Sequence, residues 1–277
     1  MTIKGDMYDV IIFSGQSNMV GSAGSYEEFS VKDAFEYRYI TDSIEPLKNP
    51  VGENILYGMK EGYPFDEKYE DKYNREHVLG APCCGNINLV PYFADEFTKL
   101  TSAKLVAVHA AKGGSQISDW MPETQLYKAA VKKAKACIEK VGIENINSIS
   151  AVWFQGESDA MEKTPYDVYY KLLEEFAESL KKDLNVGLFG IIRVGEFAST
   201  RNPENRKYDF EIMKAQEDIC KNKKDYIMLT HCANDLINNK KYENELAIGH
   251  YNAEGLKIIG REAGRALANA KKQRRIL

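Results

Sequence analysis

The chain has 277 residues, of which 44% are hydrophobic and 28% are charged, with a formal net charge of −4. This length and composition predict a globular protein with a large core, and we expect one domain spanning residues 1–277. The slightly acidic balance provides no basic surface for a polyanion, so we expect no nucleic-acid partner.

Cysteine usage and hydropathy exclude further classes of protein. The five cysteines are an odd number without CxxC spacing, which disfavours a disulfide framework or a zinc site. No run reaches the roughly 18 apolar residues of a membrane span. Residues 1–9 are polar and lead directly into an apolar run without a signal segment, so we expect a cytoplasmic protein that does not contact a membrane.

The apolar run over residues 8–13 is followed at once by Ser14-Gly15-Gln16-Ser17-Asn18. A buried parallel strand delivers a polar residue to the carboxyl edge of a sheet in this way, and open α/β folds bind their ligands at that edge. The alternative is an ordinary junction between a strand and a turn, with a capping serine.

Residues 22–80 are polar, show little periodicity and contain several turn signals, such as Asn49-Pro50 and Gly80-Ala81-Pro82. Long segments without regular elements are usually functional loops. We expect a loop-rich insertion lying over the edge of the sheet.

Strands and helices alternate about five times along the chain. Strands are expected at residues 8–13, 104–110, 149–154, 186–194 and 226–230, and helices at 89–100, 124–141, 165–180, 209–220 and 254–270. This alternation predicts a five-stranded parallel sheet with helices on both faces, for which the strand order 2-1-3-4-5 is plausible.

Four loops at or beyond strand ends carry polar and glycine residues, and the fold brings them to one edge. They contain Ser17, Gly113-Gly114-Ser115, the run from Gln155 to Asp159, and Gly249-His250. These residue types suit acyl transfer, because a serine hydroxyl needs a base and histidine is the usual base near neutral pH. Among the four histidines, His77 falls in the insertion and His109 within a strand. We favour His250 as the base and keep His231 in reserve.

An oxyanion intermediate needs donors that already point at it. The candidates are the backbone N–H of Ser17, the backbone N–H of Gly114, whose lack of a side chain allows close approach, and the side-chain amide of Gln155. Each has a structural alternative, such as a turn for Gly114 or a helix cap for Gln155.

The combination of Gly15-Gln16-Ser17-Asn18-Met19, Lys112-Gly113-Gly114-Ser115, the run from Trp153 to Asp159 and the late His250 resembles the SGNH hydrolases. More narrowly, it is similar to the sialate O-acetylesterase and acetylxylan esterase group, which is carbohydrate esterase family 6-like. The resemblance implies a flavodoxin-like three-layer α/β/α sandwich and hydrolysis of sugar O-acetyl groups without a metal or another cofactor. It also implies that Ser17 is the nucleophile, that His250 is the base, and that Ser17, Gly114 and Gln155 form the oxyanion hole. Trp120 falls near such a site, where it either shapes the substrate pocket or packs in the core.

The chain departs from the family pattern at one position. The family commonly has an aspartate three residues before the histidine, and Ala247 stands there. Three carboxylates could replace it: Glu157, Glu245 and, further off, Asp235. We favour Glu157, because it would point to the same side as Gln155 if extended geometry continues past the strand. The alternative for Glu157 is a hydrogen-bond anchor that holds its loop.

The expected function is therefore a serine esterase that deacetylates a small or oligomeric sugar. The alternatives are a carbohydrate-binding module that has lost catalysis, an acyltransferase on the same scaffold, and a lipid or thioester hydrolase. The polar insertion disfavours the last of these, because long acyl pockets are mostly apolar.

Overall fold

The computed structural model describes residues 6–21, 29–39, 41–49, 51 and 87–276 of the chain. His77, Cys83 and Cys84 lie outside the described residues. The other three cysteines, Cys137, Cys220 and Cys232, are free thiols. None of the helices within the described ranges is both long enough and apolar enough to cross a membrane.

A seven-stranded sheet forms the centre of the molecule, in the order β3-β2-β4-β1-β5-β6-β7. The strands are β1 (Tyr8–Gly15), β2 (Ser30–Arg38), β3 (Ser43–Lys48), β4 (Lys104–Ala111), β5 (Ile146–Phe154), β6 (Leu188–Ile192) and β7 (Tyr226–Thr230). All neighbouring pairs are parallel except β2 and β3. The five predicted strands are β4-β1-β5-β6-β7, so their order 2-1-3-4-5 is confirmed.

The prediction of only five strands was wrong, because β2 and β3 lie inside the segment expected to be loops. Charged residues on β2 obscured the alternation of apolar and polar residues that is typical of a strand. Glu36 is fully buried and lies 3.6 Å from the guanidinium of Arg38, also on β2. Asp33, with a φ of 61°, interrupts the regular alternation of buried and exposed side chains.

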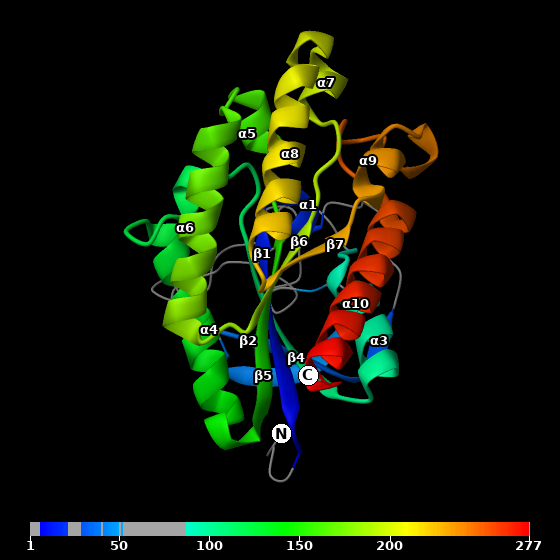
Figure 1. Ribbon diagram of the computed structural model, residues 1–277. Helices are drawn as coiled ribbons and strands as arrows, with labels where there is room; N and C mark the ends of the chain where they lie inside the picture. Colours follow the sequence, from blue (N-terminus) through cyan, green and yellow to red (C-terminus); the bar gives the residue numbers. More distant parts are fainter. Residues whose placement is uncertain (1–5, 22–28, 40, 50, 52–86, 277) are drawn as a thin grey trace, which may run out of the picture.

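Helices cover both faces of the sheet (Figure 1). The long helices are α3 (Val90–Thr101), α4 (Gln125–Val141), α6 (Tyr166–Leu184), α8 (Arg206–Asn222) and α10 (Ala253–Ile276). Helices α3 and α10 pack together on one face, and α4, α6 and α8 lie on the other. The short helices are α1 (Ser17–Val20), α5 (Glu157–Met161), α7 (Ala198–Arg201) and α9 (Cys232–Ile237), and the 3-10 turns are η3 (Ile117–Trp120), η4 (Ile143–Asn145), η5 (Pro203–Asn205) and η6 (Lys240–Tyr242). The three-layer α/β/α prediction is confirmed.

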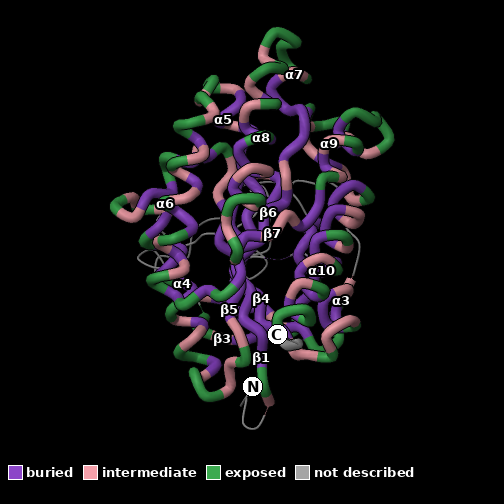
Figure 2. The backbone as a smooth tube through the Cα atoms, in the orientation of Figure 1, coloured by how far each residue is buried: buried purple, intermediate pink, exposed green. Residues whose placement is uncertain are grey.

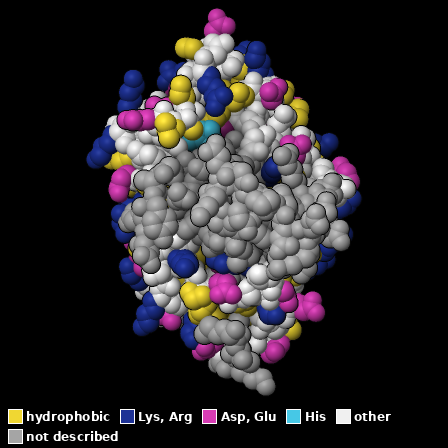
Figure 3. Space-filling view, turned by 180° about the vertical axis from the view of Figure 1, so that it is seen from behind, with side chains coloured by type: hydrophobic (Ala, Val, Ile, Leu, Met, Phe, Trp, Pro, Cys, Tyr) yellow, Lys and Arg dark blue, Asp and Glu magenta, His cyan; other side chains and the backbone are white. Residues whose placement is uncertain are grey.

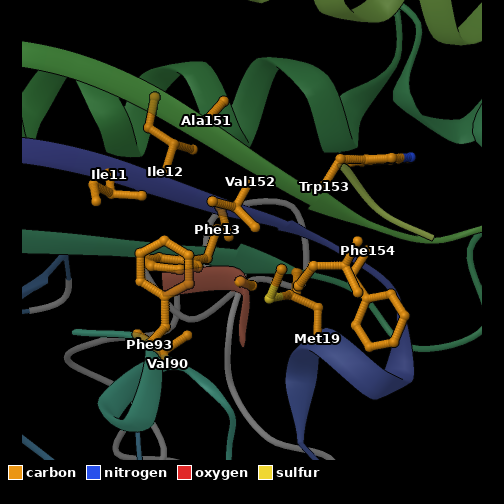
Figure 4. Packing of buried hydrophobic residues seen from close by; sticks show 14 of the residues in the cluster. Ile11, Ile12, Phe13, Met19, Val90, Phe93, Ala151, Val152, Trp153 and Phe154 are labelled. Carbon is orange, nitrogen blue, oxygen red and sulfur yellow. The ribbon is translucent and has the colours of Figure 1, made fainter. Parts of the chain in front are cut away.

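The core lies between the sheet and these helices. Figure 2 shows the central strands buried along most of their length, while exposed residues gather on the outer helix faces and in loops. Strand β1 is buried at all eight positions, because it runs between β4 and β5 and is covered on both faces. Phe13 of β1 packs edge-on against Phe93 of α3, with ring centroids 5.0 Å apart (Figure 4).

Helix α10 approaches α3 closely through two glycines. A Cβ at Gly260 would lie 2.4 Å from the Leu89 carbonyl oxygen, and one at Gly264 would lie 2.3 Å from the Phe93 carbonyl oxygen. Both distances are far below normal contact, so larger residues cannot occupy these positions without separating the helices.

We expect Gly264→Ala to lower the free energy of unfolding by about 1–3 kcal/mol, because overpacking outweighs the roughly 1 kcal/mol by which alanine favours a helix. Urea denaturation of both proteins measures the difference. The control is Asn269→Ala on the exposed side of the same helix, with an expected change within about 0.5 kcal/mol. A Gly264→Ala variant as stable as the wild type would contradict this account of the packing.

Candidate active site

Ser17 and His250 meet at the carboxyl edge of the sheet. Ser17 follows β1 and begins α1, while His250 lies in the loop that precedes α10. The Ser17 hydroxyl oxygen is 2.8 Å from Nε2 of His250, although 233 positions separate the two residues. The predicted nucleophile and the favoured base are therefore placed within hydrogen-bond distance.

The backbone of the His250 loop determines which ring nitrogen carries the proton. Nδ1 lies 3.3 Å from the carbonyl oxygen of Ala247, and the backbone N–H of His250 donates to the same oxygen at 3.0 Å. Because a carbonyl only accepts hydrogen bonds, the proton is assigned to Nδ1. Nε2 then has a free lone pair that can accept the Ser17 proton. Gly249 supplies the positive φ of 84° that this tight turn requires.

Burial lowers the pKa of His250 below its usual value, and the nearby positive charge of Arg201 acts in the same direction. Backbone hydrogen bonds to Ala247 and Ile248 oppose the change without reversing it. Burial, the largest cause, disfavours the imidazolium ion. His250 is therefore neutral near neutral pH, which is the form that can act as a base.

A pocket of about 490 Å³ opens above this pair. Its lining includes Ser17, His250, Gly113, Gly114, Gln116, Ser158, Met161, Glu162, Phe197 and Arg201. Figure 3 shows a histidine side chain reaching the surface, with hydrophobic and basic side chains beside it. The residues of this pocket come from the ends of β1, β4, β5 and β6 and from the loop before α10, so the predicted convergence of loops at one edge is observed.

Two backbone N–H groups in the pocket are suited to receive an oxyanion. No acceptor is found for the N–H of Ser17 or of Gly114 among the described parts of the chain. Gly114 has a φ of 72°, and a Cβ added there would contact nothing within 4 Å, so its backbone faces open space. Both N–H groups are therefore available for an oxygen bound in the pocket.

Glu157 lies elsewhere than predicted, because the chain does not stay extended after β5. Gly156 takes a φ of 148° and α5 begins at Glu157, so the strand alternation on which the prediction for Glu157 rested ends before that residue. Its Oε1 accepts a hydrogen bond of 2.8 Å from the side-chain amide of Asn18. Among the described residues no carboxylate is hydrogen-bonded to His250; Glu245 and Asp235 are exposed.

The comparisons with known proteins agree with this geometry. A family model described as "Carbohydrate esterase, sialic acid-specific acetylesterase" matches residues 7–269. The chain belongs to this family. A probable carbohydrate esterase of Arabidopsis thaliana is 30% identical to this esterase over 192 residues, which are 67% of each chain. The predicted family and the prediction of an ester hydrolase are confirmed.

Solved structures with low sequence identity share the fold of this carbohydrate esterase. A crystal structure of an Arabidopsis thaliana protein superposes with a TM-score of 0.65 at 17% identity, covering 96% of this chain and 98% of the other. The crystal structure of NanS gives a TM-score of 0.67 at 14% identity and covers 98% of both chains. At these low sequence identities, the structural similarity shows a shared fold alone.

Gln155 of the esterase is part of the scaffold beneath the pocket and does not line it. Its side chain is fully buried, and its amide nitrogen lies 2.5 Å from Oδ2 of Asp159, 2.9 Å from the carbonyl oxygen of Ser115 and 3.2 Å from Oε1 of Gln16. An amide nitrogen has two hydrogens, so these acceptors already occupy it. The placement gives no support to the predicted oxyanion role of Gln155.

Trp120 is also buried in the core, away from the pocket surface. Its indole N–H donates to the Ser115 hydroxyl at 2.9 Å, and its ring packs edge-on against Trp153. Trp120 therefore packs in the core, the second of its two expected roles.

His231, the reserve candidate for the base, lies at an exposed position after β7 and does not line the pocket. No group of three or more metal-ligating side chains is found in the part of the chain that the structure describes.

Phe197 and Arg201, which follow β6, line the pocket but were not predicted from the sequence. Their loop gives a weak signal, because Gly195-Glu196-Phe197 lacks a serine or histidine. The available signal was the fold itself, since parallel strands place all their carboxyl ends at one edge.

Glu157 should make the stability of the esterase depend on pH. Burial raises its pKa from 4.5 to about 7, and one of its carboxylate oxygens finds no hydrogen-bond partner among the residues that the structure describes. The folded state therefore binds a proton that the unfolded state releases above about pH 4.5. We expect the wild type to lose about 3 kcal/mol of unfolding free energy between about pH 5 and about pH 8 from this group, and Glu157→Gln to lack that loss.

Urea denaturation of both proteins at the two pH values measures the contribution of Glu157. The control is Glu139→Gln, at an exposed position of α4, which should keep the pH dependence of the wild type. If Glu157→Gln and wild type lost the same free energy, the buried carboxyl would be ionised throughout.

Proposed function

We propose that the esterase removes O-acetyl groups from a carbohydrate by an acyl-enzyme mechanism, with Ser17 as nucleophile and His250 as base. The observation that carries the proposal is the 2.8 Å contact between the Ser17 hydroxyl and Nε2 of His250. The same pocket holds two backbone N–H groups for which the described residues provide no acceptor. The family description, which names an acetylesterase, supports the choice of acyl group.

In the first half of the reaction, Nε2 of His250 takes the Ser17 proton while the serine oxygen bonds to the acetyl carbonyl carbon. The carbonyl oxygen becomes an oxyanion and accepts hydrogen bonds from the N–H groups of Ser17 and Gly114. The bond to the sugar oxygen then breaks, and that oxygen takes the proton from Nε2. In the second half, water gives a proton to Nε2 and attacks the acetyl-enzyme, releasing acetate and restoring the Ser17 hydroxyl.

The catalytic pair works in this proposal without a carboxylate partner. The Ala247 carbonyl performs the orienting role of the usual acid, because it fixes the Nδ1–H tautomer and aims Nε2 at Ser17. Its partial charge stabilises the imidazolium ion less than a carboxylate would. Glu157 then supports the site through Asn18, which adjoins the nucleophile in sequence.

We expect Ser17→Ala to abolish hydrolysis of para-nitrophenyl acetate, because no acyl-enzyme can form. Glu157→Gln should retain the wild-type kcat within about tenfold, whereas loss of a true triad acid costs about 10⁴-fold. Both effects are measured by the rates at which the wild type, Ser17→Ala and Glu157→Gln hydrolyse para-nitrophenyl acetate. Turnover by Ser17→Ala would refute the mechanism, and a 10⁴-fold loss in Glu157→Gln would restore Glu157 as the acid. A wild type that binds acetylated sugars without turnover would favour the binding-module alternative.

Arg201 provides a reason to prefer an acidic sugar. It lines the pocket, its guanidinium lies 4.9 Å from the centre of the Phe197 ring, and one of its nitrogens contacts the Ile248 carbonyl oxygen at 3.4 Å. No carboxylate within the described ranges forms an ion pair with it. An arginine held in this way can bind a sugar carboxylate through charge-assisted hydrogen bonds. This supports an O-acetylated sialic acid, the substrate named in the family description, over a neutral sugar.

We expect Arg201→Gln to reduce kcat/KM for an O-acetylated sialic acid about tenfold more than for the analogue whose carboxylate is replaced by a neutral amide. The ratio between the two substrates separates recognition of the anion from any general effect on His250. Glu123→Gln, an exposed charge change on the loop before α4, is the control and should leave the ratio unchanged. An unchanged ratio in Arg201→Gln would show that this residue does not recognise the carboxylate.

A further inference from the structure

The segment from Glu196 to Arg201, which follows β6 and contains α7, packs directly against the base. The ring of Phe197 lies edge-on to the imidazole of His250, with centroids 5.4 Å apart and an interplanar angle of 87°. Arg201 stacks on the same phenyl ring at 4.9 Å. Phe197 is only 5% exposed, so its ring separates one side of the imidazole from solvent.

Gly249 permits this close approach. A Cβ at Gly249 would lie 2.6 Å from a carbon of the Phe197 ring, well inside normal contact. The ring is therefore seated against the turn that carries His250, and any movement of Phe197 would open space beside the imidazole.

Asp209 holds the segment in place from beneath. This carboxylate in the first turn of α8 is fully buried. Its Oδ1 accepts hydrogen bonds from the backbone N–H groups of Phe197 at 3.1 Å and Ala198 at 2.9 Å. Its Oδ2 accepts from the backbone N–H of Ser199 at 2.9 Å and from the Ser199 hydroxyl at 2.7 Å.

These four hydrogen bonds matter because α7 has only four residues and cannot be stable by itself. Its first N–H groups have no acceptors within the helix, and Asp209 satisfies three backbone N–H groups at this end. A single buried side chain therefore anchors the backbone that carries the Phe197 ring.

We propose that Asp209 is a positioning residue for the reaction, which acts by fixing Phe197 against His250 and so holds the imidazole shielded from water and aimed at Ser17. The inference rests on the proposed role of His250 as the base. Asp209 contacts neither the pocket nor the reacting atoms; its effect passes through the backbone of Phe197.

Release of Phe197 would change the environment of His250 in a defined direction. Burial is the largest cause of the lowered pKa of His250, so solvent entering beside the ring would raise that pKa. The other groups that face the site are Arg201 from α7, Glu162 after α5 and Glu243, whose carboxylate accepts the Gly249 N–H. None of these residues is substituted in the variants below. Displacement of Arg201 together with the Phe197 ring would also raise the pKa of His250, so a rise reports on release of the segment.

The test compares Asp209→Asn, Phe197→Ala and the control Asp218→Asn with the wild type. Asp218 is an aspartate of the same helix that pairs with Lys214 outside the pocket, so its substitution makes the same chemical change without touching the segment. The His250 signal is assigned by its loss in His250→Gln and titrated by NMR. Para-nitrophenyl acetate gives kcat, KM and the pH profile of kcat/KM.

We expect the pKa of His250 to rise toward about 6.5 in both Asp209→Asn and Phe197→Ala. As the pH is lowered, both variants should therefore lose activity at a higher pH than the wild type does. We also expect kcat to fall about 10- to 100-fold in Asp209→Asn with KM within about threefold, because a misaimed base slows chemistry more than binding. Asp218→Asn should match the wild type in both readouts.

A folded Asp209→Asn variant whose His250 titrates as in the wild type, at unchanged kcat, would overturn the proposal and leave Asp209 a purely structural role. If Asp209→Asn does not fold, Ser199→Ala decides, because it removes one of the four hydrogen bonds and should change both readouts in the same direction by a smaller amount; no change would overturn the proposal. The titration needs no turnover. A wild type without Ser17-dependent activity would therefore refute the proposed function, while the contact between Phe197 and His250 would still be tested.

Discussion

The site depends on how tightly the end of β1 is bound to its two neighbours. The N–H of Gln16 donates to the Phe154 carbonyl of β5 at 3.1 Å, and the N–H of Lys112, just after β4, donates to the Gly15 carbonyl at 2.9 Å. A Cβ at Gly15 would lie 2.1 Å from the Phe154 oxygen, so only glycine allows the strands to stay this close. These contacts join the ends of three strands, and Ser17 follows two residues later. Ser17, the proposed nucleophile, is therefore positioned by the centre of the sheet, while His250, the proposed base, is held by a separate loop and by its contact with Phe197, just before α7.

Beneath the pocket lies a layer of buried polar side chains that would be unfavourable if any member lacked a partner. Gln155 and Asp159 hold the glycine loop after β4, because Gln155 donates to the Ser115 carbonyl and Asp159 accepts from the N–H of Ile117. Asn18 joins the two halves of the site, since it donates to Glu157 and its oxygen lies 3.4 Å from the N–H of Tyr251, the residue after His250. The polar residues around Ser17 thus support the loops from below, and the pocket itself is lined mostly by other residues.

The difference between residues that support the loops and residues that line the pocket bears on how much of the molecule could be predicted from its sequence. The five buried strands followed from apolar runs alternating with amphipathic helices, because core burial imposes both patterns, whereas their order was only a plausible one for such a sheet. Strand β2 was missed because a buried charged pair and the positive φ of Asp33 interrupt its alternation of buried and exposed residues. Ser17 and His250 were predictable from motifs, since each lies at a strand end or a helix start. The partner of His250 was not, because a backbone carbonyl leaves no mark in the side-chain sequence. The role of Glu157 depended on one φ angle at Gly156, which turned an expected extended segment into a helix.

A carbonyl in place of a carboxylate has a consequence for the chemistry of the base. A carboxylate beside Nδ1 would favour the imidazolium ion and raise the pKa of His250, whereas the surroundings observed here, burial and the positive charge of Arg201, lower it. The imidazole consequently stays neutral to a lower pH, but in the proposed mechanism it is also a weaker base when it takes the Ser17 proton. Under that mechanism, geometry has to compensate for the weakness. The Ala247 carbonyl accepts from Nδ1, the Phe197 ring packs against one side of the imidazole, and Asp209 holds the backbone of Phe197. If the mechanism holds, the residues that aim His250 matter as much to the rate as an acid would, because little electrostatic stabilisation remains to tolerate a misplaced ring.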